Sequence, residues 1–277
     1  AATFVNAVAE KAKGADGVLG TKDDISHRIA VVGFASQSGN GDNTELLSIA
    51  GSNSGNVGVA YHNITDQNLK DVLQEVDTSA GQTMVSDAIG ALAASGATQT
   101  DLGLDMAQRI LSANPVQPNE KRNRVVIVFT DGAPTSFNGF EKDVADNAIT
   151  HAGSIKTAGA TVYTIGIFAG ANAASAGTEP KGDLGQNSSS LNSACNWFMQ
   201  QVSSNNGAPR TPSYYLSAAD TGALNNIFQQ ISDNIESGGS SSTLTEESVV
   251  RDIISPQFTL PAGATASDIT LETYACT

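Results

Sequence analysis

Two groups of oxygen-bearing side chains in this 277-residue chain have the types and spacing of a cation site. Asp131 directly follows Val125–Thr130, an apolar run typical of a strand buried on both faces of a parallel sheet. Thr98 and Thr100 follow a Gly-Ala pair and precede a helical pattern. Ligands of open α/β sheets gather at the carboxyl ends of the strands. Asp131 therefore stands where a metal ligand or a catalytic carboxylate is expected.

Hydroxyl and carboxylate oxygens favour a hard cation. Mg²⁺ takes about six oxygen ligands and keeps several waters, so Thr98 and Asp131 with water would suit it. The three histidines are far apart in the sequence, which argues against a zinc site. The alternative is that Asp131 caps the following turn and that Thr98 or Thr100 caps the next helix. The residues alone leave both interpretations open.

The common enzyme signatures are missing from the sequence. No strand is followed by GxGxxG, and the chain has neither a phosphate-binding GxxxxGK loop nor a GxSxG nucleophile elbow. We therefore expect no enzyme, and a hydrolase with an unfamiliar site in the loop 169–190 is a weaker possibility. With 14 Lys and Arg against 28 Asp and Glu, the net charge of −14 argues against nucleic-acid or anionic-membrane partners. No apolar segment is long enough to insert into a membrane.

Strands and helices are predicted to alternate along most of the chain, which indicates an α/β fold. A doubly wound, mostly parallel sheet with helices on both faces fits this order. The expected strands are Ile29–Ala35, Val125–Thr130, Thr161–Phe168 and Tyr214–Leu216, and the expected helices start near Phe4, Leu69, Val85, Asp101, Glu141, Leu191 and Asp220. Residues 36–58 are predicted to be a loop or a weak hairpin, and Gly159 to end the helix that begins at Glu141.

The pattern changes near the end of the chain. We predict a domain over residues 1–236, a Ser/Gly linker over 237–243 and a partial β element of an adjoining module over 244–277, a short C-terminal β appendage. The only cysteines are Cys195 and Cys276. They would form one disulfide if the protein is exported, or remain two unrelated thiols if it is not.

Two motifs together resemble the von Willebrand factor type A domains. Gly96–Leu104 is similar to the Gly-Thr-x-Thr loop that leads into a helix in that family, and Val125–Gly132 is similar to its apolar strand ending in Thr-Asp-Gly. The resemblance implies a metal-ion-dependent adhesion site in which Thr98 contacts Mg²⁺ and Asp131 reaches it through water. A carboxylate of the partner completes the coordination, so the metal attracts an acidic group even to an acidic protein.

The sequence departs from the family pattern in one respect. The family's first strand ends in Asp-x-Ser-x-Ser, and no such motif occurs in this chain. We expect that the domain is N-terminally truncated, that its first strand lies upstream of Ala1, and that the metal site is incomplete without it. The alternative is a degenerate family member without a metal site.

The later part of the chain resembles the A domains of Gram-positive surface proteins and pilus-tip adhesins. The similar segments are Ser193–Met199, Tyr214–Tyr215, Leu224–Phe228 and Val250–Phe258. This resemblance implies a location outside the cell, at the cell surface or cell wall, a host or matrix protein as the partner, and adjoining β modules in the same polypeptide. The alternative is an intracellular A-domain subunit that serves as a scaffold in a chelatase or ATPase assembly.

Overall fold

The structure is a computed structural model that describes most of the first 240 residues. The described residues are 2–14, 16–18, 21, 24–36, 43–49, 58–93, 95–117, 122–218 and 221–240. The chain divides into the units Ala1–Ser240 and Ser241–Thr277. The predicted β element over 244–277, Cys276 and the expected helix start Asp220 all lie outside the described residues.

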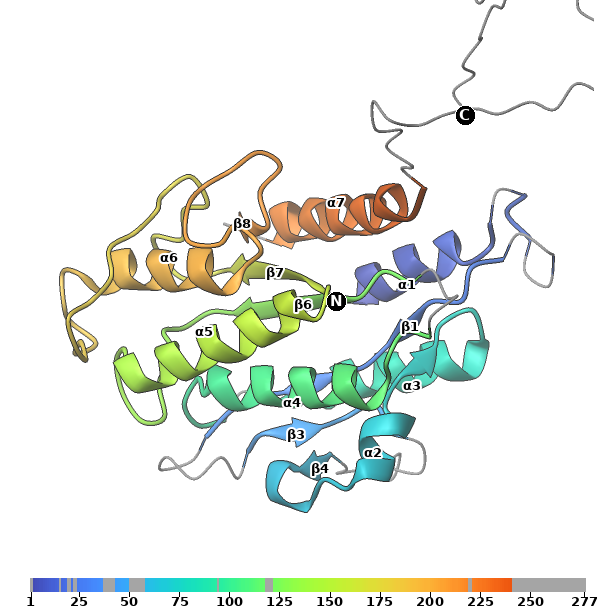
Figure 1. The fold of residues 1–277 in the computed structure, drawn as a ribbon, viewed down its shortest axis with the longest axis horizontal. Coiled ribbons are helices and arrows are strands. Elements are labelled where there is room, and N and C mark those ends of the chain that lie inside the picture. The colour runs from blue at the N-terminus through green and yellow to red at the C-terminus, as the bar shows by residue number, and fades with distance from the viewer. Residues whose placement is uncertain are drawn as a thin grey trace, which may run out of the picture. The chain divides into compact units, whose positions relative to one another are not determined.

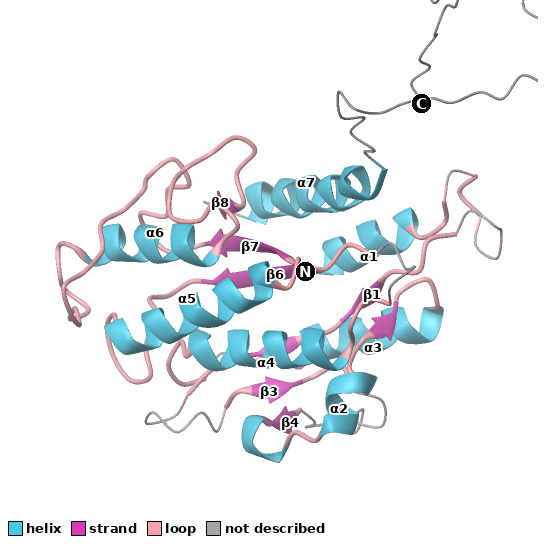
Figure 2. Ribbon diagram, in the orientation of Figure 1, coloured by secondary structure: helices cyan, strands magenta, loops and turns pink. Residues whose placement is uncertain are grey.

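A parallel sheet lies at the centre of the first unit. It contains β6 (Val125–Thr130), β7 (Thr161–Gly166) and β8 (Tyr215–Ser217) in that order, with Val125 opposite Thr161. The earlier strands are short and antiparallel. β2 (Val32–Gly33), β3 (Glu45–Leu46) and β4 (Val59–Ala60) form one set, and β1 (Arg28–Ile29) pairs with β5 (Gln74–Glu75). Figure 2 shows these strands and the helices around them.

Helices cover both faces of the parallel sheet (Figure 1). The helices α4 (Thr100–Ala113), α5 (Lys142–Thr157) and α6 (Leu191–Val202) share one core cluster with β6 and β7, while α7 (Thr221–Ser240) packs with the other face of β7. α7 also contacts α1 (Ala2–Lys11), which contacts α3 (Ser79–Gly90). The short α2 (Asp66–Asp71) contacts α4.

The alternation along β7 explains this layering. Val162 belongs to the cluster shared with α4, α5 and α6, whereas Tyr163 and Ile165 belong to the cluster shared with α7, because successive side chains of a strand point to opposite faces. The doubly wound α/β fold is thereby confirmed. Parallel pairing is restricted to β6, β7 and β8 among the residues that the structure describes. α7 runs to Ser240, so the predicted linker 237–243 begins inside this helix.

β6 packs against helices on both faces, as predicted for Val125–Thr130, but it is less buried than the prediction implied. Phe129 is 40% exposed, and Val125, Val126 and Ile127 are only partly buried, whereas β7 is buried from Val162 to Gly166. The cause is the position of β6 in the sheet. β6 pairs with β7 on one side, and no described strand pairs with its other side.

The backbone groups on this open edge of β6 can be identified. The nitrogen of Thr161 donates to the carbonyl of Arg124 at 2.9 Å, and that of Ile167 donates to Thr130 at 3.0 Å. The N–H and C=O groups of successive strand residues point to alternate sides. Val125, Ile127 and Phe129 therefore direct their backbone groups away from β7.

A second open edge belongs to the segment 28–36. Val31 accepts from the nitrogen of Leu47 at 2.9 Å, and its own nitrogen donates to the hydroxyl of Ser48 at 2.8 Å, so the odd-numbered residues face β3. By the same alternation, Ala30, Val32 and Phe34 direct their backbone groups to the opposite side. No described strand pairs with that side.

Cys195 is buried in α6 and forms no disulfide within the described part of the chain. It belongs to the main core cluster, and burial raises the pKa of its thiol from 9.0 to about 12.

Candidate functional site

The turn after β6 is held by Thr130 and leaves Asp131 free. The nitrogen of Gly132 donates to the Thr130 hydroxyl at 3.2 Å, and this hydroxyl lies 3.2 Å from the Gly132 carbonyl. Asp131 is exposed, and its carboxylate forms no hydrogen bond or ion pair with any residue that the structure describes. The interpretation of Asp131 as the cap of this turn is therefore wrong.

Neither threonine caps the helix that follows the Gly-Ala-Thr segment. α4 begins at Thr100, its N-cap residue is Gln99, and no side chain makes the capping hydrogen bond. Thr100 is 1% exposed, and its hydroxyl donates to the carbonyl of Thr98 at 3.3 Å. Thr100 is therefore buried at the start of the helix, and only Thr98 has a hydroxyl that can serve a site.

Thr98 lies against the end of β6. Its carbonyl accepts a hydrogen bond from the nitrogen of Thr135 at 2.9 Å. A Cβ atom placed on Gly132 would lie only 2.8 Å from the Thr98 hydroxyl oxygen. The structure therefore brings Thr98 next to the residue that follows Asp131. Any larger residue at position 132 would have to displace the Thr98 side chain.

Both open strand edges end close to Thr98. The nitrogen of Ser36 donates to the carbonyl of Ala97 at 2.9 Å, and the nitrogen of Ala97 donates back at 2.6 Å. The segment 28–36 thus ends beside Ala97, and β6 ends beside Thr98. Both residues that the sequence singles out, Thr98 and Asp131, therefore lie at the edge of the sheet where ligands of α/β folds gather.

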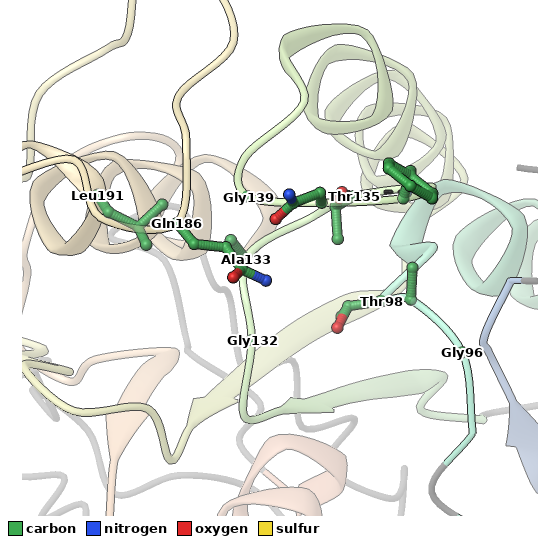
Figure 3. A pocket seen from close by; sticks show the side chains of 11 residues that line it. Gly96, Thr98, Gly132, Ala133, Thr135, Gly139, Gln186 and Leu191 are labelled. Carbon is green, nitrogen blue, oxygen red and sulfur yellow. Dashed lines mark hydrogen bonds between the residues drawn. The ribbon is translucent and has the colours of Figure 1, made fainter. Parts of the chain in front are cut away.

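A hollow of about 260 Å³ opens beside Thr98 and Gly132 (Figure 3). Figure 3 shows Thr98 on one side of it and Gln186 and Leu191 on the other. Every lining residue is uncharged, although the whole chain carries a net charge of −14. The lining residues are Gly96, Ala97, Thr98, Gly132, Ala133, Thr135, Phe137, Asn138, Gly139, Gln186 and Leu191.

The Glu141 carboxylate holds the loop 134–140, which forms one wall of the hollow. It accepts hydrogen bonds from the hydroxyls of Thr135 and Ser136 and from the backbone nitrogens of Ser136, Phe137 and Asn138, at 2.6–3.4 Å. Partial burial opposes ionisation of Glu141, but the hydrogen bonds from Ser136, Thr135 and Asn138 together outweigh it, so the pKa of Glu141 is lowered from 4.5. The loop is thus fixed by one ionised side chain.

Two buried amides of α6 hold the loop 167–190, which forms the other wall. The Asn196 amide nitrogen donates to the carbonyl of Gly170 at 2.9 Å, and that of Gln200 donates to Ala173 and Ser175 at 2.9 Å. Phe140 and Leu184 then exchange two backbone hydrogen bonds of 2.8 Å between the loops. These contacts bring Gln186 to the hollow.

The sequence did not indicate Phe137 or Gln186 as site residues. Phe137 was detectable in principle, because a phenylalanine within the polar run Thr-Ser-Phe-Asn-Gly is a conspicuous exception. Gln186 was not, because its position depends on contacts between distant segments. His, Cys, Asp and Glu nowhere come together in threes as a metal site would require, within the part of the chain that the structure describes.

Thr98 and Asp131 nevertheless fit a hard cation. Both offer oxygen, and among the described residues the Thr98 hydroxyl, like the Asp131 carboxylate, has no hydrogen-bond partner. Two protein oxygens are few for Mg²⁺, which fills the rest of its coordination sphere with water or with further ligands. The pair offers neither sulfur nor imidazole, so it does not suit softer metals.

The fold and the site define a Rossmann-like, doubly wound α/β domain whose polar residues gather at the carboxyl ends of its strands. Residues 70–230, more than half of the chain, match the von Willebrand factor type A domain family, and the chain belongs to this family. Domains of this family are generally protein-interaction modules. No described helix has the length and apolar character needed to cross a membrane.

Among solved structures, a von Willebrand factor type A protein from Catenulispora acidiphila is similar to this chain. The identity is 14% and the TM-score 0.45, and the match covers 84% of this chain but 37% of the other. The chain thus spans well under half of the length of that structure. A comparison with curated proteins gives no match.

Proposed function

We propose that this domain binds a protein partner through Mg²⁺ held by Thr98 and Asp131. The observation that supports this most directly is that the Thr98 hydroxyl and the exposed Asp131 carboxylate have no hydrogen-bond partner among the described residues. The two residues lie at the ends of two neighbouring segments. When bound, the ion supplies positive charge and coordination positions for a carboxylate of the partner. The protein's own residues orient the ion and form the uncharged surface beside it.

We also propose that an extended strand from the polypeptide preceding Ala1, carrying Asp-x-Ser-x-Ser, pairs between β6 and the segment 28–36. Val125, Ile127 and Phe129 on one edge and Ala30, Val32 and Phe34 on the other have backbone groups suited to such pairing. Both edges end at residues 97–98 and 131–132. A strand in this place would therefore end beside Thr98 and Asp131 and add oxygen ligands to them.

The proposed setting is outside the cell, at the surface or cell wall of a Gram-positive bacterium. The resemblance to pilus-tip adhesins over Ser193–Met199 and Val250–Phe258 supports this setting, and it would place further β modules after residue 243. A host or matrix protein is then the partner. An export signal and a wall-sorting signal in the complete gene would support this proposal, whereas the absence of both would favour the intracellular scaffold.

Manganese provides the test of the metal site, because Mn²⁺ accepts the same oxygen ligands as Mg²⁺ and broadens nearby amide resonances. We expect Mn²⁺ to broaden the amides of Thr98, Asp131 and Gly132 first, and added Mg²⁺ to reverse the effect. A protein that includes the proposed preceding strand should bind Mn²⁺ about tenfold or more tightly than residues 1–277. It should also protect the amides of Ile127 and Phe129 from hydrogen exchange.

Single substitutions separate this site from general attraction of cations to an acidic protein. Thr98→Ala and Asp131→Asn should each weaken Mn²⁺ binding about tenfold. Asp87→Asn removes an exposed carboxylate from α3 and should change nothing. Equal effects of Asp131→Asn and Asp87→Asn, or broadening spread evenly over the surface, would show that the proposed site is wrong.

A further inference from the structure

We infer that the hollow beside Thr98 selects the residue next to the partner's acidic side chain, and that Phe137 makes this selection by apolar contact. The partner is a protein segment in which an acidic residue is followed by an apolar one. This inference rests on the proposed function, since the acidic residue is the one that reaches the metal. The inference specifies, in addition, which type of residue follows the acidic one in the partner, because the metal does not select that residue.

Phe137 is the most exposed large apolar residue of the described structure. It is 75% exposed, against 37–56% for the other five in this group. Its exposure coincides with the site, because it lines the hollow that also includes Thr98 and Gly132. An aromatic side chain that stays exposed to water forgoes the favourable free energy of burial, and aromatic residues, Phe among them, are enriched in the buried core of protein interfaces.

The backbone that carries Phe137 is fixed before any partner arrives. Its nitrogen lies 3.1 Å from the Glu141 carboxylate and 3.2 Å from the Thr135 hydroxyl. Asn138 and Ser136 on either side donate to the same carboxylate. A partner therefore does not have to order this loop when it binds. Because no free energy is lost in ordering the loop, the contact with Phe137 contributes more to the affinity.

The lining of the hollow favours an uncharged, apolar neighbour over a charged one. It contains no Lys, Arg, Asp or Glu, so a charged side chain entering it would lose water without gaining an opposite charge. Ala97, Ala133 and Leu191 add apolar surface to that of Phe137. Gln186 offers amide donors and an acceptor, which suit the backbone of an extended segment.

Three capped tetrapeptides test this inference on the protein that includes the proposed preceding strand. Ac-Gly-Asp-Leu-Gly-NH₂ carries both features, Ac-Gly-Asp-Ser-Gly-NH₂ lacks the apolar side chain, and Ac-Gly-Asn-Leu-Gly-NH₂ lacks the carboxylate. Binding is measured from amide shifts in the presence of Mg²⁺. We expect the Asp-Leu peptide to bind about fivefold more tightly than the Asp-Ser peptide, and the Asn-Leu peptide not to bind.

The variant Phe137→Ala should reduce the preference for leucine over serine to about one, mainly by weakening binding of the Asp-Leu peptide. The matched control is Ile25→Ala, which removes a 47% exposed apolar side chain outside the hollow and should keep the preference. Equal, Mg²⁺-dependent binding of the Asp-Leu and Asp-Ser peptides to the unmodified protein would overturn the inference and leave the metal site intact. Binding that survives removal of Mg²⁺, or no binding of any peptide, would overturn both proposals.

Discussion

Glu141 should stabilise the site loop through its charge as well as its shape. The substitution Glu141→Gln keeps the length of the side chain but replaces one carboxylate oxygen with an NH₂ group that cannot accept a hydrogen bond. One oxygen of Glu141 accepts from the backbone and hydroxyl of Ser136, and the other from the hydroxyl of Thr135 and the backbone of Phe137 and Asn138.

The magnitude follows from the better of the two amide orientations. If the NH₂ group of the substituted amide faces Ser136, the Ser136 hydroxyl can rotate and accept a hydrogen bond from it. The Ser136 N–H then has no acceptor. The remaining hydrogen bonds, which had a charged acceptor, become neutral ones. A hydrogen bond to a charged group contributes about 1.5–3 kcal/mol and a neutral one about 1 kcal/mol. Because water reaches this loop, we expect Glu141→Gln to lower the free energy of unfolding by about 1–2 kcal/mol.

Urea unfolding at several pH values measures this effect. The folded-state pKa of Glu141 is lowered from 4.5, so its contribution is fully present above the pKa of the unfolded chain and is lost as the pH falls through the folded-state pKa. The difference in unfolding free energy between the unmodified protein and the Glu141→Gln variant should be constant from about pH 6 to 7 and shrink below about pH 4.5. The control Glu179→Gln alters a carboxylate that is 60% exposed and should cost less than about 0.5 kcal/mol. A difference for Glu141→Gln that is equally small at neutral pH, or that persists unchanged at about pH 3, would refute the reasoning.

Two further predictions concern the core. Gly103→Ala in α4 would place a Cβ atom 2.8 Å from the Cβ of Phe34 and should lower the free energy of unfolding by about 1–3 kcal/mol, whereas Gly90→Ala has no atom within 4 Å and should raise it by about 0.5–1 kcal/mol. Urea unfolding compares the two, and an unaffected Gly103→Ala protein would mean that Phe34 does not pack on α4. In a Cys276→Ser background, the Cys195 thiol, whose pKa is raised to about 12, should resist iodoacetamide at about pH 8 until urea unfolds the protein. Equally fast labelling of the folded protein would contradict its burial.

The sequence was most informative where a local pattern determines local structure. The apolar run Val125–Thr130 became β6 with Asp131 directly after it, and Gly159, with a φ of 82°, ends α5 as expected. The choice between Thr98 as a cap and Thr98 as a site residue could not be made from the sequence. It depends on where α4 begins, and the actual N-cap is one residue later, at Gln99.

The walls of the hollow depend on contacts between distant segments, which a single sequence does not reveal. Gln186 is brought to the hollow by the Phe140–Leu184 backbone pair and by the buried amides of Asn196 and Gln200. In the sequence, Asn196 and Gln200 are only two polar positions of a predicted helix. Their effect on the site can be seen only in the structure, where the loop that they hold lines the hollow.

The segment predicted as one strand, Ile29–Ala35, forms regular pairs only at Arg28–Ile29 and Val32–Gly33. The side chains had the composition of a buried strand, and the error shares its cause with that at β6. A strand that lacks a neighbour on one side leaves part of its side chains uncovered even where helices pack on both faces, and here each segment has an open edge. Because these edges end on either side of Thr98 and beside Asp131, the same pairing that would bury Val32 and Phe129 would also surround the proposed cation. We therefore expect sheet stability and metal affinity to rise together when the proposed preceding strand is present.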